Sequence, residues 1–238
     1  MSSVSGFAYV GSELELFAHA TNWKSYFASR IRPHLGEEVL EVGAGLGGTT
    51  RILCKQPHKR WICLEPDGQL VTTLQSAISS QELPPCCQAR TGTLTDLADD
   101  ELFDSMLYID VLEHIENDGG ELAHAAEHLR PGGKVIVLSP AHQWLFTPFD
   151  QAIGHFRRYN KKMLGSLTPT TLEPVRISYL DSVGMLASMG NRYVLGSGMP
   201  TPRQLWIWDK LMVPFSRLLD PLLFHSLGKS ILGVWRKR

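Results

Sequence analysis

The sequence predicts an α/β domain with a doubly wound parallel sheet covered by helices, and three observations carry this prediction. Between residues 37 and 138, short runs rich in β-forming residues alternate with segments of helical periodicity, the order typical of parallel sheets. A glycine-rich turn, EVGAGLGG, follows the first of these runs directly. The apolar run 106–109 suits a strand that is buried on both of its faces.

The expected elements alternate between strand and helix through this core. In chain order, the predicted strands are EEVLEVGAG with its turn, RWICLEPD, CCQARTGTL, FDSMLYIDVLEH and KVIVLSP. A helix is expected to begin in LGGTTRILCKQ, and Asp67 is placed to cap a second helix through Leu70, Leu74 and Ile78. The segment NDGGELAHAAEHLR predicts a further helix, which PGG ends before the fifth strand.

Further segments flank the core on either side. Residues 13–35 carry apolar side chains at helical spacing, and residues 1–36 are interpreted as an N-terminal helical cover. The core is assigned to residues 37–185, and LEPVRISYLDSVGMLAS, residues 172–188, offers one or two further strands. Residues 186–238 are interpreted as a C-terminal cap of short amphipathic helices ending in a basic cluster. We therefore expect a single domain over residues 1–238.

Composition excludes several classes of protein. Apolar residues make up 43% of the chain and charged residues 20%, as in ordinary globular domains. The formal net charge of −1 gives no reason to expect a nucleic-acid partner, which usually binds through a basic stripe. No apolar run is long enough to span a membrane and no signal peptide is evident, so a cytoplasmic protein is expected. Four cysteines match no zinc spacing and are expected to be reduced thiols without a metal: Cys54, Cys63, Cys86 and Cys87.

The glycine turn fits two chemistries. Gly43, Gly45 and Gly48 have the G-x-G-x-x-G spacing of a turn that binds dinucleotides and serves hydride transfer. Gly43, Gly45 and Gly47 fit equally well a turn that holds S-adenosylmethionine and serves methyl transfer. Either ligand would lie beyond the carboxyl end of the first strand, where open α/β sheets bind their ligands. The spacing alone does not decide between them.

Two glutamates near the glycine turn, Glu41 and Glu65, give further information about the cofactor, and Glu41 helps to decide between the two. Glu41 stands two residues before the first glycine, where it would repel a pyrophosphate but suit the sulfonium and ammonium groups of S-adenosylmethionine. The alternative for Glu41 is a cap on local backbone. Glu65 ends the second strand, about 20 residues past the glycines, and can accept hydrogen bonds from the ribose of either cofactor, unless it is only a solvated strand-end acid. Methyl transfer is therefore favoured.

Four motifs extend this interpretation: VLEVGAGLGGTT, CLEPD, FDSMLYIDVLEHI and LRPGGKVIVLSP. In this order and at these intervals they resemble the motifs of class I S-adenosylmethionine-dependent methyltransferases, over about residues 37–140. The resemblance implies a Rossmann-like fold in which Gly43, Gly45 and Gly47 line the methionine part and Glu65 holds the ribose. It also implies that Thr93 and Leu94 flank the adenine and that Asp110 faces the methionine end.

The residues after the fourth strand are candidates for the reaction itself. Glu113 and His114 follow that strand at the mouth of the expected site. Similar Glu-His pairs occur in quinone-ring O-methyltransferases, where they help to coordinate a divalent metal. Too few further carboxylates are evident here, so no metal is expected. The alternative for His114 is packing or capping at the start of a helix.

Residues 142–159, after the fifth strand, concentrate histidine, arginine and aromatic side chains on the face where substrates enter. The stretch resembles bacterial methyltransferases associated with cell-surface glycan or lipid-linked synthesis. We predict that it forms the acceptor pocket. The catalytic candidates are His155, His142 and His114, and the substrate-binding candidates are Trp144, Arg157, Arg158 and Tyr159. The alternative for at least one of the arginines is a structural ion pair with Asp150.

The predicted function is transfer of a methyl group from S-adenosylmethionine to oxygen or nitrogen of a small molecule or lipid-linked saccharide. The alternatives are an NAD-dependent oxidoreductase and a non-catalytic module that binds S-adenosylmethionine. Nucleic-acid methylation is disfavoured because DVLE, and no N-P-P-Y-type tetrad, follows the fourth strand. The C-terminal tail is interpreted as a packed lid or a homodimer contact, with peripheral membrane contact as the alternative.

Overall fold

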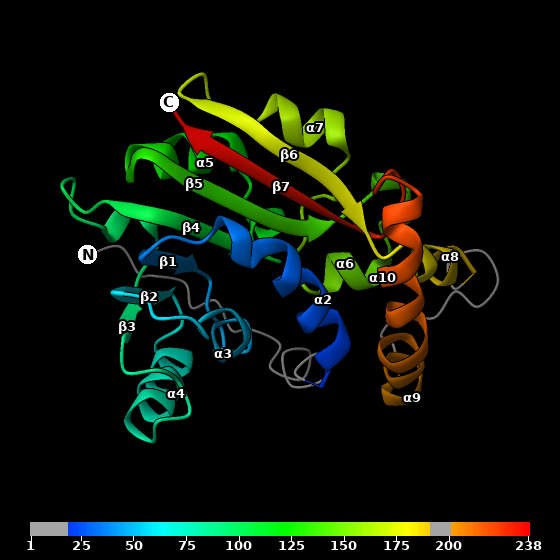
Figure 1. The fold of residues 1–238 in the computed structure, drawn as a ribbon, viewed down its shortest axis with the longest axis horizontal. Coiled ribbons are helices and arrows are strands. Elements are labelled where there is room, and N and C mark those ends of the chain that lie inside the picture. The colour runs from blue at the N-terminus through cyan, green and yellow to red at the C-terminus, as the bar shows by residue number, and fades with distance from the viewer. Residues whose placement is uncertain (1–18, 191–200) are drawn as a thin grey trace.

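The computed structural model describes residues 19–190 and 201–238. Its strands are β1 (Glu38–Val42), β2 (Arg60–Glu65), β3 (Cys87–Thr91), β4 (Phe103–Ile109), β5 (Leu129–Pro140), β6 (Leu172–Leu180) and β7 (Ser230–Lys237). They form a seven-stranded sheet of order β3-β2-β1-β4-β5-β7-β6 (Figure 1). The first five strands run parallel, and β7 is antiparallel to both of its neighbours. The order reverses between β1 and β4, which is where such sheets bind ligands.

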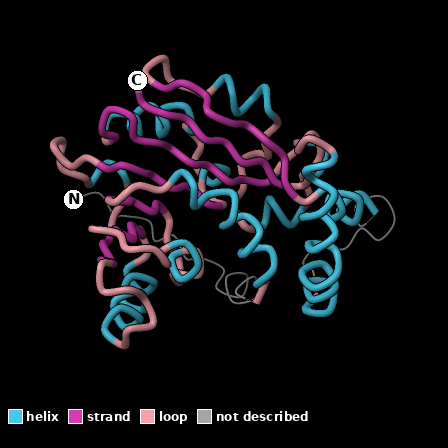
Figure 2. Tube along the Cα trace, in the orientation of Figure 1, coloured by secondary structure: helices cyan, strands magenta, loops and turns pink. Residues whose placement is uncertain are grey.

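Helices cover both faces of the sheet, as the predicted fold class requires (Figure 2). They are α2 (Thr21–Ile31), α3 (Thr50–Leu53), α4 (Gly68–Ser79), α5 (Asp118–Glu127), α6 (Pro148–Ala152), α7 (Lys161–Ser166), α8 (Ser182–Gly190), α9 (Pro202–Ile207) and α10 (Val213–Leu222). Buried residues of α2 and α4 pack with one face of β1, β2 and β4. Buried residues of α5 and α7 pack with the other face. Asp67 caps α4 as predicted, accepting hydrogen bonds from the backbone of Gln69 and Leu70.

The C-terminal segment is only partly the helical cap that the sequence predicts. Helices α9 and α10 are joined by one π-helical stretch, Trp208–Met212, into a continuous column beside the carboxyl ends of the parallel strands (Figure 1). The prediction is wrong for Ser230–Lys237, which form β7 between β5 and β6. The first six residues of β7 are buried, so the segment is a core strand. Of the residues predicted to continue β6, Ser182–Gly190 form helix α8 instead.

The N-terminal cover is helical over Thr21–Ile31, in agreement with the prediction, while residues 1–18 lie outside the described part of the chain. The polar face of the C-terminal column fastens α2 to the domain. The Tyr26 hydroxyl donates to Asp220 over 2.7 Å, and the Trp23 backbone donates to Asp209 over 2.9 Å. The indole rings of Trp23 and Trp208 lie 5.9 Å apart. Helices from the two ends of the described chain therefore form one wall.

Candidate active site

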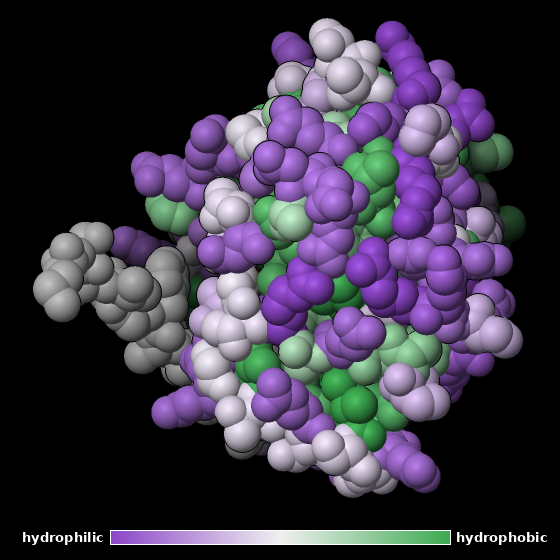
Figure 3. Space-filling view, turned by 90° about the vertical axis from the view of Figure 1, so that its left-hand side faces the viewer, coloured by the Kyte–Doolittle hydropathy of each residue, from purple (hydrophilic) through white to green (hydrophobic). Residues whose placement is uncertain are grey.

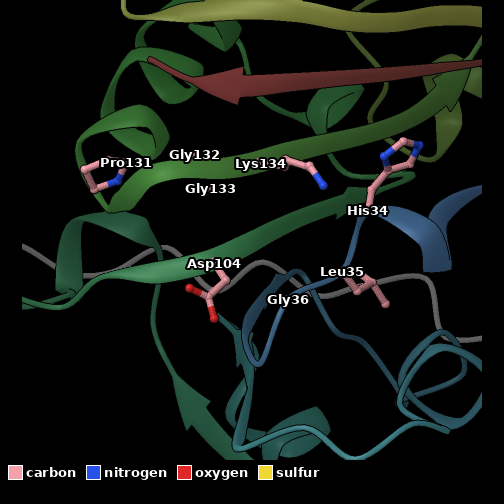
Figure 4. Close-up of a pocket in the computed structure, with 8 residues that line it drawn as sticks. All are labelled: His34, Leu35, Gly36, Asp104, Pro131, Gly132, Gly133 and Lys134. Carbon is pink, nitrogen blue, oxygen red and sulfur yellow. The ribbon is translucent and has the colours of Figure 1, made fainter.

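The carboxyl ends of the parallel strands gather the residues that the sequence selects. The glycine turn follows β1, Glu65 ends β2, Thr93 follows β3 and Asp110 follows β4, while residues 142–159 follow β5. A small pocket at the opposite edge of the sheet is lined by His34, Leu35, Gly36, Asp104, Pro131, Gly132, Gly133 and Lys134 (Figure 4). Those residues precede or begin strands, so this pocket lies away from the ligand-binding edge.

The glycine turn has the backbone that a close-fitting ligand requires. Gly43, Gly45 and Gly47 have φ values of 66°, 55° and 73°, a region that side chains strain. A Cβ atom on Gly43 would also lie 2.6 Å from a methyl group of Val111. Glycine at this position therefore satisfies both a conformational and a steric requirement, and contact of the turn with the methionine part of the donor stays a prediction.

Glu65 lies against the glycine turn and is 4% exposed. Its carboxylate accepts the Gly45 backbone N–H over 2.9 Å and the Asp67 backbone N–H over 3.1 Å. Burial raises the pKa of Glu65 above its usual value, against the effect of these two hydrogen bonds. The structure therefore holds Glu65 at the junction of β2 and the turn, and its role as the ribose ligand stays a prediction.

Glu41 does not point toward the donor, which corrects the expectation from the sequence. Its carboxylate is 2% exposed and accepts hydrogen bonds from the Thr50 hydroxyl and the Trp61 indole, over 2.7 and 2.9 Å. Burial raises the pKa of Glu41 to about 7, although both hydrogen bonds oppose the shift. Glu41 therefore joins β1, β2 and α3 inside the fold instead of facing the cationic ligand.

The two residues expected at the adenine have different environments. Thr93 is exposed and caps a short 3-10 helix together with Asp96, whose carboxylate accepts the Thr93 backbone N–H over 2.7 Å. Leu94 is 1% exposed and packs in the core, so its side chain presents no surface to adenine. The expectation is corrected for Leu94 because the turn after β3 directs that side chain inward.

Asp110 is an exposed carboxylate at the carboxyl end of β4, and its position toward the methionine end of the donor stays a prediction. It directly follows β4, has a φ of 55° and keeps an exposed side chain. Although the residue is exposed, the surrounding protein atoms partly remove water from its carboxyl group, and this desolvation raises the pKa of Asp110 to about 6; the charges of His155, Lys229 and Lys24 lower it. Lys24 is a residue that sequence reasoning missed, because no motif marks α2. Its ammonium lies against the glycine turn, 2.8 Å from where a Cβ atom of Gly48 would be.

This pKa predicts a pH-dependent donor affinity. As the pH falls through about 6, Asp110 takes up a proton and loses the charge that attracts the cationic donor. We expect the dissociation constant for S-adenosylmethionine to rise about fivefold, corresponding to roughly 1 kcal/mol of lost attraction. Calorimetry across this pH range measures the change. Asp110→Asn should bind weakly and show no such pH dependence, and an equal dependence in both proteins would contradict the role of Asp110.

Asp150 is the centre of the segment after β5. It is 1% exposed, and Arg158 binds both of its carboxylate oxygens over 2.7 and 2.8 Å. The His155 ring nitrogen Nδ1 lies 3.0 Å from the same carboxylate. Burial alone would raise the pKa of Asp150, but the hydrogen bonds from His155 and Arg158 outweigh burial and lower it. A permanently charged aspartate thus orients the His155 imidazole.

The second ring nitrogen of His155, Nε2, lies on the side of Glu113 and His114, which follow β4. That atom lies 3.9 Å from Glu113 Oε1, and the His155 ring meets that of His114 edge-on at 4.6 Å. Glu113 is completely buried; Ser139 donates to its Oε2, whereas Oε1 has no hydrogen-bond partner. Burial, with Asp110 nearby, raises the pKa of Glu113 well above its usual value, and burial with His155 lowers that of His114 to about 4.

Glu113, His114 and His155 therefore form one cluster next to Asp110. Their ligand atoms lie within 4.8 Å of one another, so the cluster could hold a metal ion as well as exchange protons with an acceptor. The sequence shows only the Glu113-His114 pair, because His155 arrives from a distant segment. That no metal is bound stays a prediction.

Three of the residues expected to bind the acceptor are engaged within the protein. Arg158 pairs with Asp150, which confirms the predicted alternative of a structural ion pair. Arg157 pairs with Asp118 over 2.6 Å and donates to the Glu116 carbonyl. Tyr159 is fully buried and its hydroxyl donates to Asp118 over 2.8 Å. The expectation is wrong for Tyr159, whose side chain belongs to the core.

The two remaining candidates lie on the open side of the segment. Trp144 is 42% exposed and its ring lies 5.5 Å from that of His142. His142 has a φ of 67°, stacks on Tyr179 at 4.6 Å, and has an unpartnered Nε2. Burial lowers the pKa of His142, so a neutral imidazole is favoured. His142 thus shares a wall with Trp144 but lacks the carboxylate that orients His155.

Comparison with known proteins agrees with this geometry. A family model described as a methyltransferase domain matches residues 40–135. The demethylmenaquinone methyltransferase of Tropheryma whipplei (strain Twist) is 28% identical over 182 residues, which cover 73% of this chain and 70% of that protein. A geranyl diphosphate methyltransferase solved with S-adenosylmethionine superimposes with a TM-score of 0.65 at 12% identity, covering 98% of this chain and 93% of its own.

A second solved structure gives the same fold. The putative sarcosine dimethylglycine methyltransferase from Galdieria sulphuraria has a TM-score of 0.60 at 16% identity, over 90% of this chain and 83% of its own. The sheet has the fold of class I S-adenosylmethionine-dependent methyltransferases, and residues 40–135 match a methyltransferase domain. The chain is an enzyme whose methyl donor is S-adenosylmethionine, and the NAD-dependent alternative is wrong.

Proposed function

We propose that this enzyme methylates a hydroxyl or amine of a small-molecule acceptor, with His155 as the group that takes up the acceptor's proton. The observation that carries the proposal is the Asp150–His155 pair, held 3.0 Å apart beside Asp110 and the donor turn. A carboxylate that accepts from one ring nitrogen leaves the other nitrogen oriented as a proton acceptor. In His155 that nitrogen is Nε2, on the side of Glu113 and His114.

When bound, S-adenosylmethionine supplies an electrophilic methyl group on a sulfonium, which is an excellent leaving group. The residues of this chain need to hold the acceptor in line, exclude water and remove a proton. Asp110 and Lys24, which interact with each other, would hold the methionine end of the donor, and the wall of His142 and Trp144 would offer the acceptor an aromatic surface. Because an amine already carries a nucleophilic lone pair, His155 matters most for a hydroxyl acceptor.

A screen with radiolabelled donor tests this proposal. The purified protein is incubated with labelled S-adenosylmethionine and separate pools of hydroxylated quinones, lipid-linked saccharides, amines and small alcohols. Transfer of label to a hydroxyl or amine, lost in His155→Gln, supports the proposal. Transfer to carbon, or turnover that does not depend on His155, contradicts it. Donor binding without turnover on any pool would instead support the non-catalytic alternative.

We further propose that the acceptor is carried by a membrane, because the C-terminal column has an unusual distribution of side chains. Its apolar residues point outward: Leu211, Phe215, Leu218 and Leu222 are between 52% and 73% exposed. Its polar residues point inward, and Asp209, Ser216 and Asp220 are at most 2% exposed. Figure 3 shows the opposite side of the molecule, where hydrophilic residues predominate. The outward face, here called the apolar stripe, suits a partner that is itself apolar.

The charges around the apolar stripe favour an anionic bilayer as this partner. Arg203 and Arg217 are exposed on the same column, and Lys210, which is also exposed, pairs with Asp209 over 3.0 Å. The two carboxylates of the column, Asp209 and Asp220, are buried and hydrogen-bonded. A second copy on this face would bring like charges together, while anionic lipid head groups would neutralise them. In the described residues no helix is both long and apolar enough to cross a bilayer, so the proposed contact is peripheral.

Vesicle flotation measures the proposed binding to membranes directly. The protein should float with vesicles that contain phosphatidylglycerol and much less with pure phosphatidylcholine. Leu218→Gln with Leu222→Gln should reduce the bound fraction by about tenfold or more, because both side chains would lose their burial in lipid. Arg217→Glu should also weaken binding.

Matched control variants test the site of contact. Val175→Gln replaces an apolar residue that is 46% exposed on β6, and Lys162→Glu reverses an exposed charge on α7. Neither should change flotation. Self-association that the stripe variants abolish, without vesicle binding, would assign the stripe to a homodimer and contradict the membrane contact.

A further inference from the structure

Three of the four cysteines converge, although they come from different parts of the sequence. Cys54 is the C-cap residue of α3, whereas Cys86 and Cys87 stand at the start of β3. The Sγ atom of Cys54 lies 3.6 Å from that of Cys86 and 3.8 Å from that of Cys87. All three sulfur atoms lie within 4.8 Å of one another, and all are free thiols.

The distances between these sulfur atoms are those expected around a bound zinc ion. Zinc–sulfur bonds of about 2.3 Å in tetrahedral geometry place neighbouring sulfur atoms roughly 3.8 Å apart. The two measured separations match this value. Sulfur is also the ligand that thiophilic cations prefer over oxygen, and no acidic side chain joins the group among the described residues.

We propose that Cys54, Cys86 and Cys87 together bind one thiophilic divalent cation, with zinc as the expected ion. Each thiol releases its proton to solvent as its thiolate binds the ion. Cys54 and Cys87 are 3% exposed, whereas Cys86 is only partly buried, so the ion has a path from solvent and a position for a water ligand. The inference rests on the thiols alone and does not depend on the identity of the methyl acceptor.

Such an ion would join two elements that the sheet alone does not connect. It would fix the end of α3 to the start of β3, on opposite sides of β2 in the chain. Helix α3 begins directly after the glycine turn, and its Thr50 hydroxyl bonds Glu41. The ion would therefore support the donor turn from behind without touching a reacting atom.

The fourth cysteine provides a matched control. Cys63 is fully buried on β2, and its Sγ lies 3.6 Å from the Thr50 hydroxyl. It also neighbours the Cys87 thiol, but it is not one of the three thiols whose sulfur atoms all lie within 4.8 Å of one another. Cys63→Ser should therefore leave metal uptake unchanged, whereas Cys54→Ser and Cys86→Ser should weaken it. Because Cys86 is partly exposed, Cys86→Ser tests the site with little disturbance of the core.

Metal analysis and cadmium titration of the full chain, purified under reducing conditions, test the proposal. We expect about one zinc per chain, and a sulfur-to-cadmium absorption band that saturates at about one equivalent. Cys86→Ser should lower the apparent affinity for cadmium by about tenfold or more. Thermal unfolding should shift upward with zinc in the wild type and in Cys63→Ser, but not in Cys86→Ser.

Several results would overturn the assignment. One is the absence of both zinc and a cadmium band in the wild type. Another is a cadmium affinity that Cys86→Ser leaves unchanged or that Cys63→Ser reduces equally. Loss of free thiols to a disulfide between Cys54 and either neighbour, without metal uptake under reducing conditions, would make the group a redox pair instead. Donor binding, measured separately by calorimetry, stays informative about methyl transfer in each case.

Discussion

His155→Gln is expected to lower turnover on a hydroxyl acceptor by roughly 10²- to 10⁴-fold, the usual contribution of a positioned proton acceptor. The physical reason is the Asp150 carboxylate, which lies 3.0 Å from His155 Nδ1 and fixes the ring with Nε2 toward the cluster after β4. Glutamine can keep the hydrogen bond to Asp150 but cannot take up a proton. Steady-state kinetics with the acceptor found by the labelled screen measure the loss.

Donor binding separates this effect from unfolding. Calorimetry should give His155→Gln a dissociation constant for S-adenosylmethionine close to that of the wild type. His128→Gln is a matched control, because His128 is also buried, at 3% exposure, but bonds the Glu101 carbonyl at the opposite edge of the sheet. A similar loss of turnover in His128→Gln, or loss of donor binding in His155→Gln, would show that His155 acts through the fold.

Glu65→Ala is expected to weaken donor binding by about 1–3 kcal/mol, because it removes a charged acceptor from the ribose position. In the structure the Glu65 carboxylate holds the Gly45 N–H over 2.9 Å, so the variant also loosens the glycine turn. Glu65→Gln, which retains an acceptor oxygen, should fall between the wild type and the alanine variant. Calorimetry with S-adenosylmethionine and with its demethylated product measures both.

Glu41→Gln is the informative comparison for Glu65. Glu41 is 2% exposed and already has a pKa of about 7, so a neutral side chain there changes little that the donor can sense. We expect its donor affinity to stay within about twofold of the wild type. A large loss in Glu41→Gln with no loss in Glu65→Ala would reverse the two roles.

The core of the fold could be predicted because β1, β2 and β4 are short buried runs next to a recognisable turn or cap, and the second half of β5 is such a run too. Strand β3 is mostly not buried and follows from its place in the alternation of strands and helices. The last strand could not be predicted. Its residues Ser230–Lys237 follow a helical segment interrupted by prolines and end in basic side chains. These residues form a strand because they pair with both β5 and β6, and in that position Ile231, Leu232 and Val234 are completely buried. No local pattern in the sequence reveals this position between two strands.

The candidate site likewise contains some features that the sequence predicts and others that it does not. Residue type and position placed Glu65 and Asp110 correctly at the strand ends, because strand ends follow from topology. The direction of a side chain depends on its neighbours, so Glu41 turned inward to Trp61 and Tyr159 turned inward to Asp118. Clusters of side chains from distant segments could not be predicted from the sequence either, because they too depend on which residues become neighbours in the fold. The approach of His155 to Glu113 is one case, and the three thiols are another.

The insertion of β7 between β5 and β6 also dictates an order of assembly. Within the described sheet, β6 pairs with no strand other than β7, so β6 cannot join the sheet until residues 230–237 have been synthesised. The parallel strands from β1 to β5 have no such requirement, and even their most distant pairing, Val39 with Ser105, is nearer in sequence than any pairing of β5 with β7. During synthesis the donor half should therefore form first. The acceptor side, which rests on the bridge from Ala141 to the Lys229 carbonyl, should be completed last.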